Sequence, residues 1–137
     1  TINVEAVYFL SKEVGNMMIE TKTPGHILNI SSSSSTKPAM SPYKISKWAL
    51  RGMTLGLAEM YTPYGITVNA IAPGKTATPM MKYDAQEKDI CCEDQPCGRY
   101  ILPQEVAKLA TYMVSEFSSM VIGQTVFISG GNGTTII

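Results

Sequence analysis

The chain lacks net charge, long apolar runs and a secretion signal. Its 11 Lys and Arg residues balance its 11 Asp and Glu residues, so no surplus charge draws it to nucleic acid or to anionic lipid. No apolar run approaches the ~20 residues that a membrane-spanning helix needs, and the first residues lack the basic flank and cleavage site of a signal peptide. We therefore expect a cytoplasmic protein without a nucleic-acid or membrane partner.

Cysteine and histidine are also scarce. The three cysteines, Cys91, Cys92 and Cys97, share one polar stretch, and an odd number leaves at least one thiol unpaired in a monomer. They lack the paired Cys-x-x-Cys spacing of a zinc site, and the single histidine, His26, is distant in sequence. The sequence thus disfavours both a disulfide-stapled secreted module and a metal site.

The length allows one domain. With 137 residues and 45% apolar content, the chain can form one hydrophobic core but not two ordinary domains. Its first residue is Thr1 rather than Met, and the apolar pattern is already present at Ile2, Val4 and Val7. We expect the chain to be part of a longer protein.

Apolar periodicity and turn residues predict alternating helices and strands. In chain order, the expected elements are helix 1–21, strand 26–30, helix 42–61, strand 66–72, helix 103–118 and strand 124–129. The second helix should begin at Ser41-Pro42, because serine caps a helix and proline suits its first position. This alternation predicts an α/β fold whose parallel sheet is covered by helices on both faces.

Ligands of such sheets bind beyond the carboxyl ends of the strands. That rule directs attention to the serines 31–35, to the segment from Pro73-Gly74 onward and to Gly130-Gly131-Asn132-Gly133. The polar stretch 75–102 is too long for an ordinary connection, and loops of that length are usually functional or disordered. We expect residues 79–102 of this stretch to determine the substrate. Within it, Met80, Met81, Tyr83 and the cysteines either line a substrate pocket or pack as a lid.

One tyrosine and one lysine are suited to acid/base chemistry. Tyr43 and Lys47 lie four residues apart on the second expected helix and so project from one face. A tyrosine ordinarily titrates near ~10, and a close ammonium lowers that pKa toward the working range of a general acid. A strand-end serine hydroxyl can hold the reacting oxygen. Tyr8 and Lys12 share the spacing, but no strand-end hydroxyl precedes them, so we expect that pair to form an ordinary, partly buried helix face.

In their order and spacing, these segments resemble the short-chain dehydrogenase/reductase family, most closely its 3-oxoacyl-(acyl-carrier-protein) reductase type. The resemblance runs through 25–32, 43–47, 68–74, 78–80, 122–124 and 130–131. It implies that residues 1–137 are the C-terminal half of one doubly wound, Rossmann-type domain. The family's glycine-rich N-terminal half is absent from this chain.

The resemblance implies an NAD(P)-dependent oxidoreductase that interconverts a ketone and a secondary alcohol by hydride transfer. Tyr43 would be the general acid or base, and Lys47 would lower its pKa and bind the nicotinamide ribose. Ser32 would polarise the substrate oxygen, with Ser31 as the alternative because the connection to Tyr43 is shorter than the family's usual one. Asn3 would hold a water in the proton relay behind the lysine.

The resemblance also implies a cofactor and partners. Pro73, Gly74, Thr76 and Thr78 fall where the family contacts the nicotinamide end of NAD or NADP. A homo-oligomer, either a dimer or a tetramer, is implied, and we expect a second chain or a further segment to cover the open sheet edge. The substrate would be a small carbonyl compound or alcohol. The alternative is a non-catalytic fragment or assembly subunit of such an enzyme.

Overall fold

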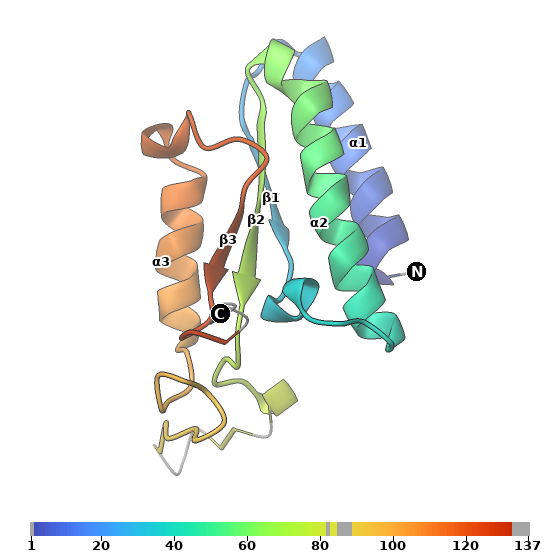
Figure 1. Ribbon diagram of the computed structural model, residues 1–137. Helices are drawn as coiled ribbons and strands as arrows, with labels where there is room; N and C mark the ends of the chain where they lie inside the picture. The colour runs from blue at the N-terminus through green and yellow to red at the C-terminus, as the bar shows by residue number, and fades with distance from the viewer. Residues whose placement is uncertain (1, 82, 85–88, 133–137) are drawn as a thin grey trace.

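A parallel three-stranded sheet forms the centre of the computed structural model, which describes residues 2–81, 83–84 and 89–132. The strands are β1 (His26–Ile30), β2 (Thr67–Pro73) and β3 (Thr125–Ile128), in that order across the sheet. Helices α1 (Val7–Glu20) and α2 (Pro42–Tyr61) cover one face and α3 (Pro103–Met113) covers the other (Figure 1). The expected α/β architecture is confirmed. Thr1, Gly133 and residues 82 and 85–88 of the expected substrate region lie outside the described residues.

The parallel register brings the strand ends together. His26 pairs with Thr67 at the start of β1, and Ile30 pairs with Ile71 at its end. Beyond that pair, the backbone N–H of Ser31 donates to the carbonyl of Ile71 at 2.7 Å. All three strands therefore point to one end of the sheet, where the turn after β1 and the long segment after β2 gather (Figure 1).

The core lies between α2 and the sheet. It contains Leu57, Ala58 and Tyr61 of α2, together with Ile66 just before β2 and Val68 within it. Helix α2 begins as expected, because the Ser41 side chain accepts a hydrogen bond from the backbone N–H of Lys44 and proline occupies the first turn. This start fixes where the first turn of α2 lies relative to the end of β1.

The packing of α1 differs from the expected apolar face. Leu10 and Met17 are exposed, whereas the buried residues of the helix are Ser11 and Gly15. The reason is steric, because the ring of Tyr61 lies where a side chain at Gly15 would be: a Cβ there would approach the ring to 2.6 Å at Cε2. Small residues let α1 pack closely over this buried tyrosine.

Helix α3 ends five residues earlier than the expected 118, at Met113, and is followed by the 3-10 turn Glu116–Ser118. The hydroxyl of Ser118 donates to the carbonyls of Met113 and Ser115 at 2.9 Å each. The Ser118 hydroxyl thus donates to carbonyl groups that would accept from backbone N–H groups if the helix continued. None of the helices that the structure describes is long and apolar enough to cross a membrane.

Replacing Gly15 with alanine tests the contact between α1 and α2. Although alanine favours helix by about 1 kcal/mol over glycine, the new methyl would overlap the Tyr61 ring, so we expect Gly15→Ala to lower the free energy of unfolding by about 1–3 kcal/mol. Gly56→Ala on α2, where nothing lies within 4 Å, is the control and should be neutral or stabilising. Chemical denaturation measures both. A Gly15→Ala protein as stable as the Gly56→Ala control would contradict this packing.

Candidate functional site

A cavity of about 430 Å³ lies beyond the ends of β1 and β2. The described lining comes from the segment after β1, the first turn of α2, the segment after β2 and, after β3, Asn132. Of the residues proposed from the sequence, the lining includes Ser31, Ser32, Tyr43, Pro73, Gly74, Thr76 and Thr78. Lys47 and Asn3 are close to this group but line a second cavity, described below.

The two candidate serines are in different hydrogen-bonding states. Ser31 is buried, and its hydroxyl has no hydrogen-bond partner among the described residues. The Ser32 oxygen accepts from the backbone N–H of Ser34 at 3.1 Å and so caps the 3-10 turn Ser33–Thr36. Its own proton remains available to an oxygen in the cavity. Both hydroxyls therefore have donor capacity beside the cavity.

Lys47 is held behind Tyr43 by the end of β1. Its ammonium donates to the carbonyl of Ile30 at 2.9 Å and lies 5.7 Å from the centroid of the Tyr43 ring. Partial burial lowers the pKa of Lys47 from its usual value of 10.5. Tyr43 itself is 48% exposed, so its ring is accessible from the cavity. The pair places a cation within reach of a phenolate at the cavity wall.

The second Tyr-x-x-x-Lys pair has nearly the same internal geometry. The ammonium of Lys12 lies 5.4 Å from the Tyr8 ring centroid. Tyr8 is 39% exposed on α1 and is absent from the lining of the strand-end cavity. The spacing therefore produces the same contact twice, and only the pair on α2 lies beside strand-end hydroxyls.

Asn3 contacts α2 but does not line the strand-end cavity. It belongs to the π-helical turn Ile2–Ala6 that leads into α1, and its side-chain amide donates to the hydroxyl of Ser46 at 3.2 Å. Ser46 donates in turn to the carbonyl of Tyr43 at 2.7 Å. Asn3 and Lys47 both line a cavity of about 530 Å³ along the outer edge of β1. The structure thus brings Asn3 next to Lys47 but not into the strand-end cavity.

The turn after β2 is tied to the segment before α3. The hydroxyl of Thr76 donates to the carbonyl of Gly74 at 3.1 Å. The backbone N–H of Ala77 donates to the carbonyl of Ile101 at 2.8 Å, and the N–H of Ile101 donates back to Lys75 at 2.9 Å. Residues 75–77 and 101 therefore form a short parallel bridge beside the cavity.

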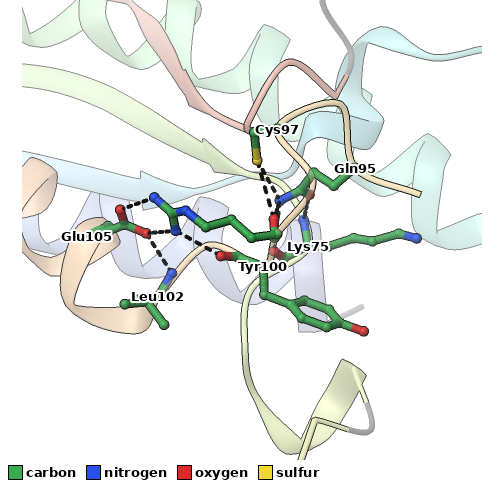
Figure 2. A network of polar contacts seen from close by, with 7 residues as sticks. Lys75, Gln95, Cys97, Tyr100, Leu102 and Glu105 are labelled. Carbon is green, nitrogen blue, oxygen red and sulfur yellow. Dashed lines mark hydrogen bonds and ion pairs between the residues drawn. The ribbon is translucent and has the colours of Figure 1, made fainter. Parts of the chain in front are cut away.

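Gln95 holds this bridge together, and sequence analysis missed it. Its side chain is 1% exposed; its oxygen accepts from the backbone N–H of Lys75 at 2.9 Å. Its amide donates to the carbonyl of Arg99 at 2.7 Å and, more weakly, to that of Lys75 at 3.4 Å (Figure 2). A glutamine in a polar stretch has no pattern that marks it as buried. The only local signal is the neighbouring Pro96 and Gly98, which indicate a tight turn.

An ion pair anchors the other end of the same segment. The guanidinium of Arg99 contacts both carboxylate oxygens of Glu105, at 2.9 and 2.8 Å (Figure 2). Glu105 also accepts from the backbone N–H of Leu102 at 2.8 Å, at the N-terminus of α3. The hydrogen bond from Arg99, followed by that from Leu102, lowers the pKa of Glu105 to about 2. The carboxylate of Glu105 therefore stays ionised at neutral pH, and its bonds to Arg99 and Leu102 are kept.

The expected substrate region has two kinds of residue. Met80 and Met81 line the cavity, whereas Tyr83 packs edge-on against Tyr100 with ring centroids 5.7 Å apart. All three cysteines are free, and the expectation that at least one would be unpaired is met. They are not among the described residues that line the cavity. Within the described residues, no group of three His, Cys, Asp or Glu side chains could hold a metal ion.

Comparisons with known proteins identify the family of this chain. A family model described as Enoyl-(Acyl carrier protein) reductase matches residues 1–132. The 3-oxoacyl-(acyl-carrier-protein) reductase of Rickettsia felis is 35% identical over 133 residues, which cover 95% of this chain and 55% of the relative. A short-chain dehydrogenase/reductase of Armillaria gallica is 32% identical over 143 residues, covering 96% and 54%. The chain spans about half the length of the curated relatives it matches.

Solved structures give the same result. Gluconate 5-dehydrogenase from Burkholderia cenocepacia, in complex with NADP and tartrate, superposes with a TM-score of 0.83 and 32% identity, covering 98% of this chain and 54% of that one. A 3-oxoacyl-(acyl-carrier-protein) reductase from Brucella melitensis with bound NAD gives a TM-score of 0.79 and 33% identity, covering 97% and 50%. With its fold, its strand-end cavity and its relatives in agreement, the chain belongs to the short-chain dehydrogenase/reductase family of oxidoreductases.

Proposed function

We propose that the protein interconverts a ketone and a secondary alcohol with NAD or NADP, using Tyr43 as general acid or base. One observation carries this proposal. The same cavity is lined by the strand-end serines, by Tyr43 and by the turn expected to contact the nicotinamide, namely Pro73, Gly74, Thr76 and Thr78. The proton donor and the cofactor contacts therefore face a shared space.

The residues present fit a nicotinamide cofactor. The unpartnered hydroxyl of buried Ser31 is a polar group at the cavity that lacks a protein partner, as expected beside a polar ligand. Tyr43 and Lys47 would hold the ribose hydroxyls, and the turn from Pro73 to Thr78 would hold the nicotinamide end. When bound, the nicotinamide supplies or accepts the hydride. The complexes of two similar proteins, one with NADP and one with NAD, support this assignment.

In the direction of ketone reduction, this chain's residues deliver the proton. Ser32, or Ser31 in its place, donates a hydrogen bond to the carbonyl oxygen and polarises it. Tyr43 gives its hydroxyl proton to that oxygen, so the new O–H bond forms as the tyrosine O–H bond breaks. The ammonium of Lys47 stabilises the resulting phenolate. Asn3, beside Lys47, would hold a water that helps return the proton from solvent.

The Gln95 network keeps the cofactor-facing turn in place. Gln95 bonds both the N–H and the C=O of Lys75, the residue between Gly74 and Thr76. Its oxygen lies 3.1 Å from where a Cβ at Gly74 would be, and the backbone oxygen of Ser129 lies closer, at 2.8 Å, so the turn has no room for a side chain there. Gln95 is therefore a positioning residue, which acts through the turn rather than on the substrate.

Apolar side chains on the outer helices support a homo-oligomer, which we propose to be a dimer or tetramer. On α1 and α2 the exposed apolar residues include Phe9, Leu10, Ile45 and Leu55, each more than half exposed. A second group, Phe117 and Met120, is 88% exposed beyond α3. Large exposed apolar patches mark association surfaces in soluble proteins, and we propose that these side chains belong to such surfaces. The outer edge of β1 is a further surface, which we propose is covered by another strand.

Tyr43→Phe tests the proposed chemistry. Loss of the hydroxyl should lower kcat for carbonyl reduction at least about 100-fold, because a general acid contributes that much or more. Unfolding by denaturant should change little, since the ring is half exposed. Tyr8→Phe, at the second pair with the same spacing, is the matched control and should retain full activity. Near-normal turnover by Tyr43→Phe would refute the acid/base role. A wild-type protein that reduces no carbonyl with NADH or NADPH would favour the non-catalytic alternative.

Gln95→Leu tests the positioning role. The variant leaves the N–H and C=O of Lys75 and the C=O of Arg99 without their side-chain partner, so we expect a loss of about 1–3 kcal/mol in unfolding free energy. The KM for the nicotinamide cofactor should rise several-fold more than kcat falls. Gln104→Leu, at an exposed position of α3, is the control. Equal changes in kcat and KM, or none, would count against Gln95 acting on the cofactor-facing turn.

Light scattering of the purified protein tests the oligomer. We expect a mass at least twice that of one subunit, and Leu55→Asp or Phe117→Asp should reduce it by placing a charge on an apolar contact. Lys108→Asp, on the polar side of α3, introduces the same side chain as a control. A monomer at micromolar concentration would show that these patches have another purpose.

A further inference from the structure

The strand-end cavity contains a cation that the proposed chemistry does not use. Lys37 lines the cavity and directly follows the 3-10 turn Ser33–Thr36. Its ammonium donates to the side-chain oxygen of Asn132, which comes from the segment after β3 and lines the same cavity. This partner is neutral, so the contact orients the ammonium without cancelling its charge.

The other lysine at the cavity is neutralised. Lys75 forms an ion pair with Asp94 at 2.8 Å, and that hydrogen bond raises the pKa of Lys75 and lowers the pKa of Asp94. No Asp or Glu is present among the described residues that line the cavity. Lys37 therefore supplies the positive charge of the described lining.

The backbone fixes Lys37 relative to the reacting groups. Ser32 and Lys37 flank the same turn, Ser32 at its start and Lys37 at its end, and the carbonyl of Lys37 accepts from the indole N–H of Trp48 at 2.8 Å. The turn separates their backbones by roughly 10 Å at ~2 Å per residue. Met80 and Met81 add apolar wall to the same cavity. A hydroxyl, an apolar wall and a cation thus face one space.

We propose that Lys37 and Asn132 bind an anionic group of the substrate, at a distance from the carbonyl that Ser32 and Tyr43 act on. The substrate class is then an oxo acid, a hydroxy acid or a phosphate-bearing acyl compound, rather than a neutral ketone. This inference rests on the proposed oxidoreductase function and specifies its substrate. Lys37 binds by charge and hydrogen bond, and Asn132 adds its amide N–H group as a second donor.

The test compares matched anionic and neutral substrates. In one arm, 4-oxopentanoate and 5-oxohexanoate are each compared with their methyl esters. In the other, 3-oxobutanoyl pantetheine 4′-phosphate is compared with 3-oxobutanoyl pantetheine. The wild-type protein, Lys37→Met, Lys37→Arg and Lys44→Met are assayed with NADH and NADPH. Lys44 is the matched control, because its ammonium donates to the carbonyl of Pro38 and is not part of the described cavity lining.

The measured quantity is the ratio of kcat/KM for the anion to kcat/KM for its neutral partner. We expect a ratio well above one in wild type in at least one arm, and a fall of at least about tenfold in Lys37→Met, as for loss of a charge-assisted hydrogen bond. Lys37→Arg should keep most of the preference and Lys44→Met all of it. Should Lys37→Met not fold, Lys37→Gln replaces it. The arm that responds shows whether the anion is a carboxylate or a phosphate.

The outcomes separate this inference from the proposed function. Turnover with no anion preference in either arm, or a preference that Lys37→Met leaves intact, overturns the role of Lys37 and leaves the oxidoreductase proposal standing. A purely structural role for Lys37 would lower activity on charged and neutral substrates alike, so the ratio would stay constant and the inference would fail. No turnover of any carbonyl compound overturns the proposed function, and this inference with it.

Discussion

Parallel pairing of β1 with β2 is the constraint on which the site depends. Because Ile30 pairs with Ile71, and the N–H of Ser31 continues the ladder to the Ile71 carbonyl, the serines and the turn after β2 leave the sheet side by side. An antiparallel pair would send them to opposite ends. The same register leaves the carbonyl of Ile30 available to accept from Lys47, so the sheet also sets the position of the lysine that we propose supports Tyr43.

The two Tyr-x-x-x-Lys pairs show that a local contact is not a site. Helical spacing alone brings Lys12 over Tyr8 and Lys47 over Tyr43 at nearly equal distances. The difference lies in what surrounds each pair. Lys47 also donates to the carbonyl of Ile30 at the end of β1, and burial lowers the pKa of Lys47. Lys12, by contrast, belongs to α1. The role that we propose for Tyr43 therefore depends on its tertiary placement, and the four-residue spacing contributes only the contact between tyrosine and lysine.

Sequence patterns predicted the features that neighbouring residues determine, such as the ends of helices and strands. The strand 26–30 and the helix 42–61 match the observed bounds, because turn residues and a serine cap define them. The patterns could not show that Gly15 is buried. Hydrophobic periodicity is read from large apolar residues, whereas Gly15 is buried because the ring of Tyr61 packs against it. Nor could the patterns identify Gln95, because a glutamine that will be buried cannot be told from an exposed one in the sequence. Its burial depends on its bonds to the N–H and C=O of Lys75 and to the C=O of Arg99. Long-range packing decides both positions.

The two candidate serines differ in what a bound ligand would change. Ser32 already accepts from the N–H of Ser34, so its oxygen is fixed and its proton is directed by whatever acceptor enters the cavity. The Ser31 hydroxyl has no hydrogen-bond partner in the described part of the chain, and a buried hydroxyl in that state costs about 1–3 kcal/mol. A ligand that bonds Ser31 would recover this cost, whereas the Ser32 oxygen is already fixed by its bond from Ser34. In the reaction that we propose, we therefore expect Ser32 to contact the reacting oxygen and Ser31 to bind a neighbouring polar group.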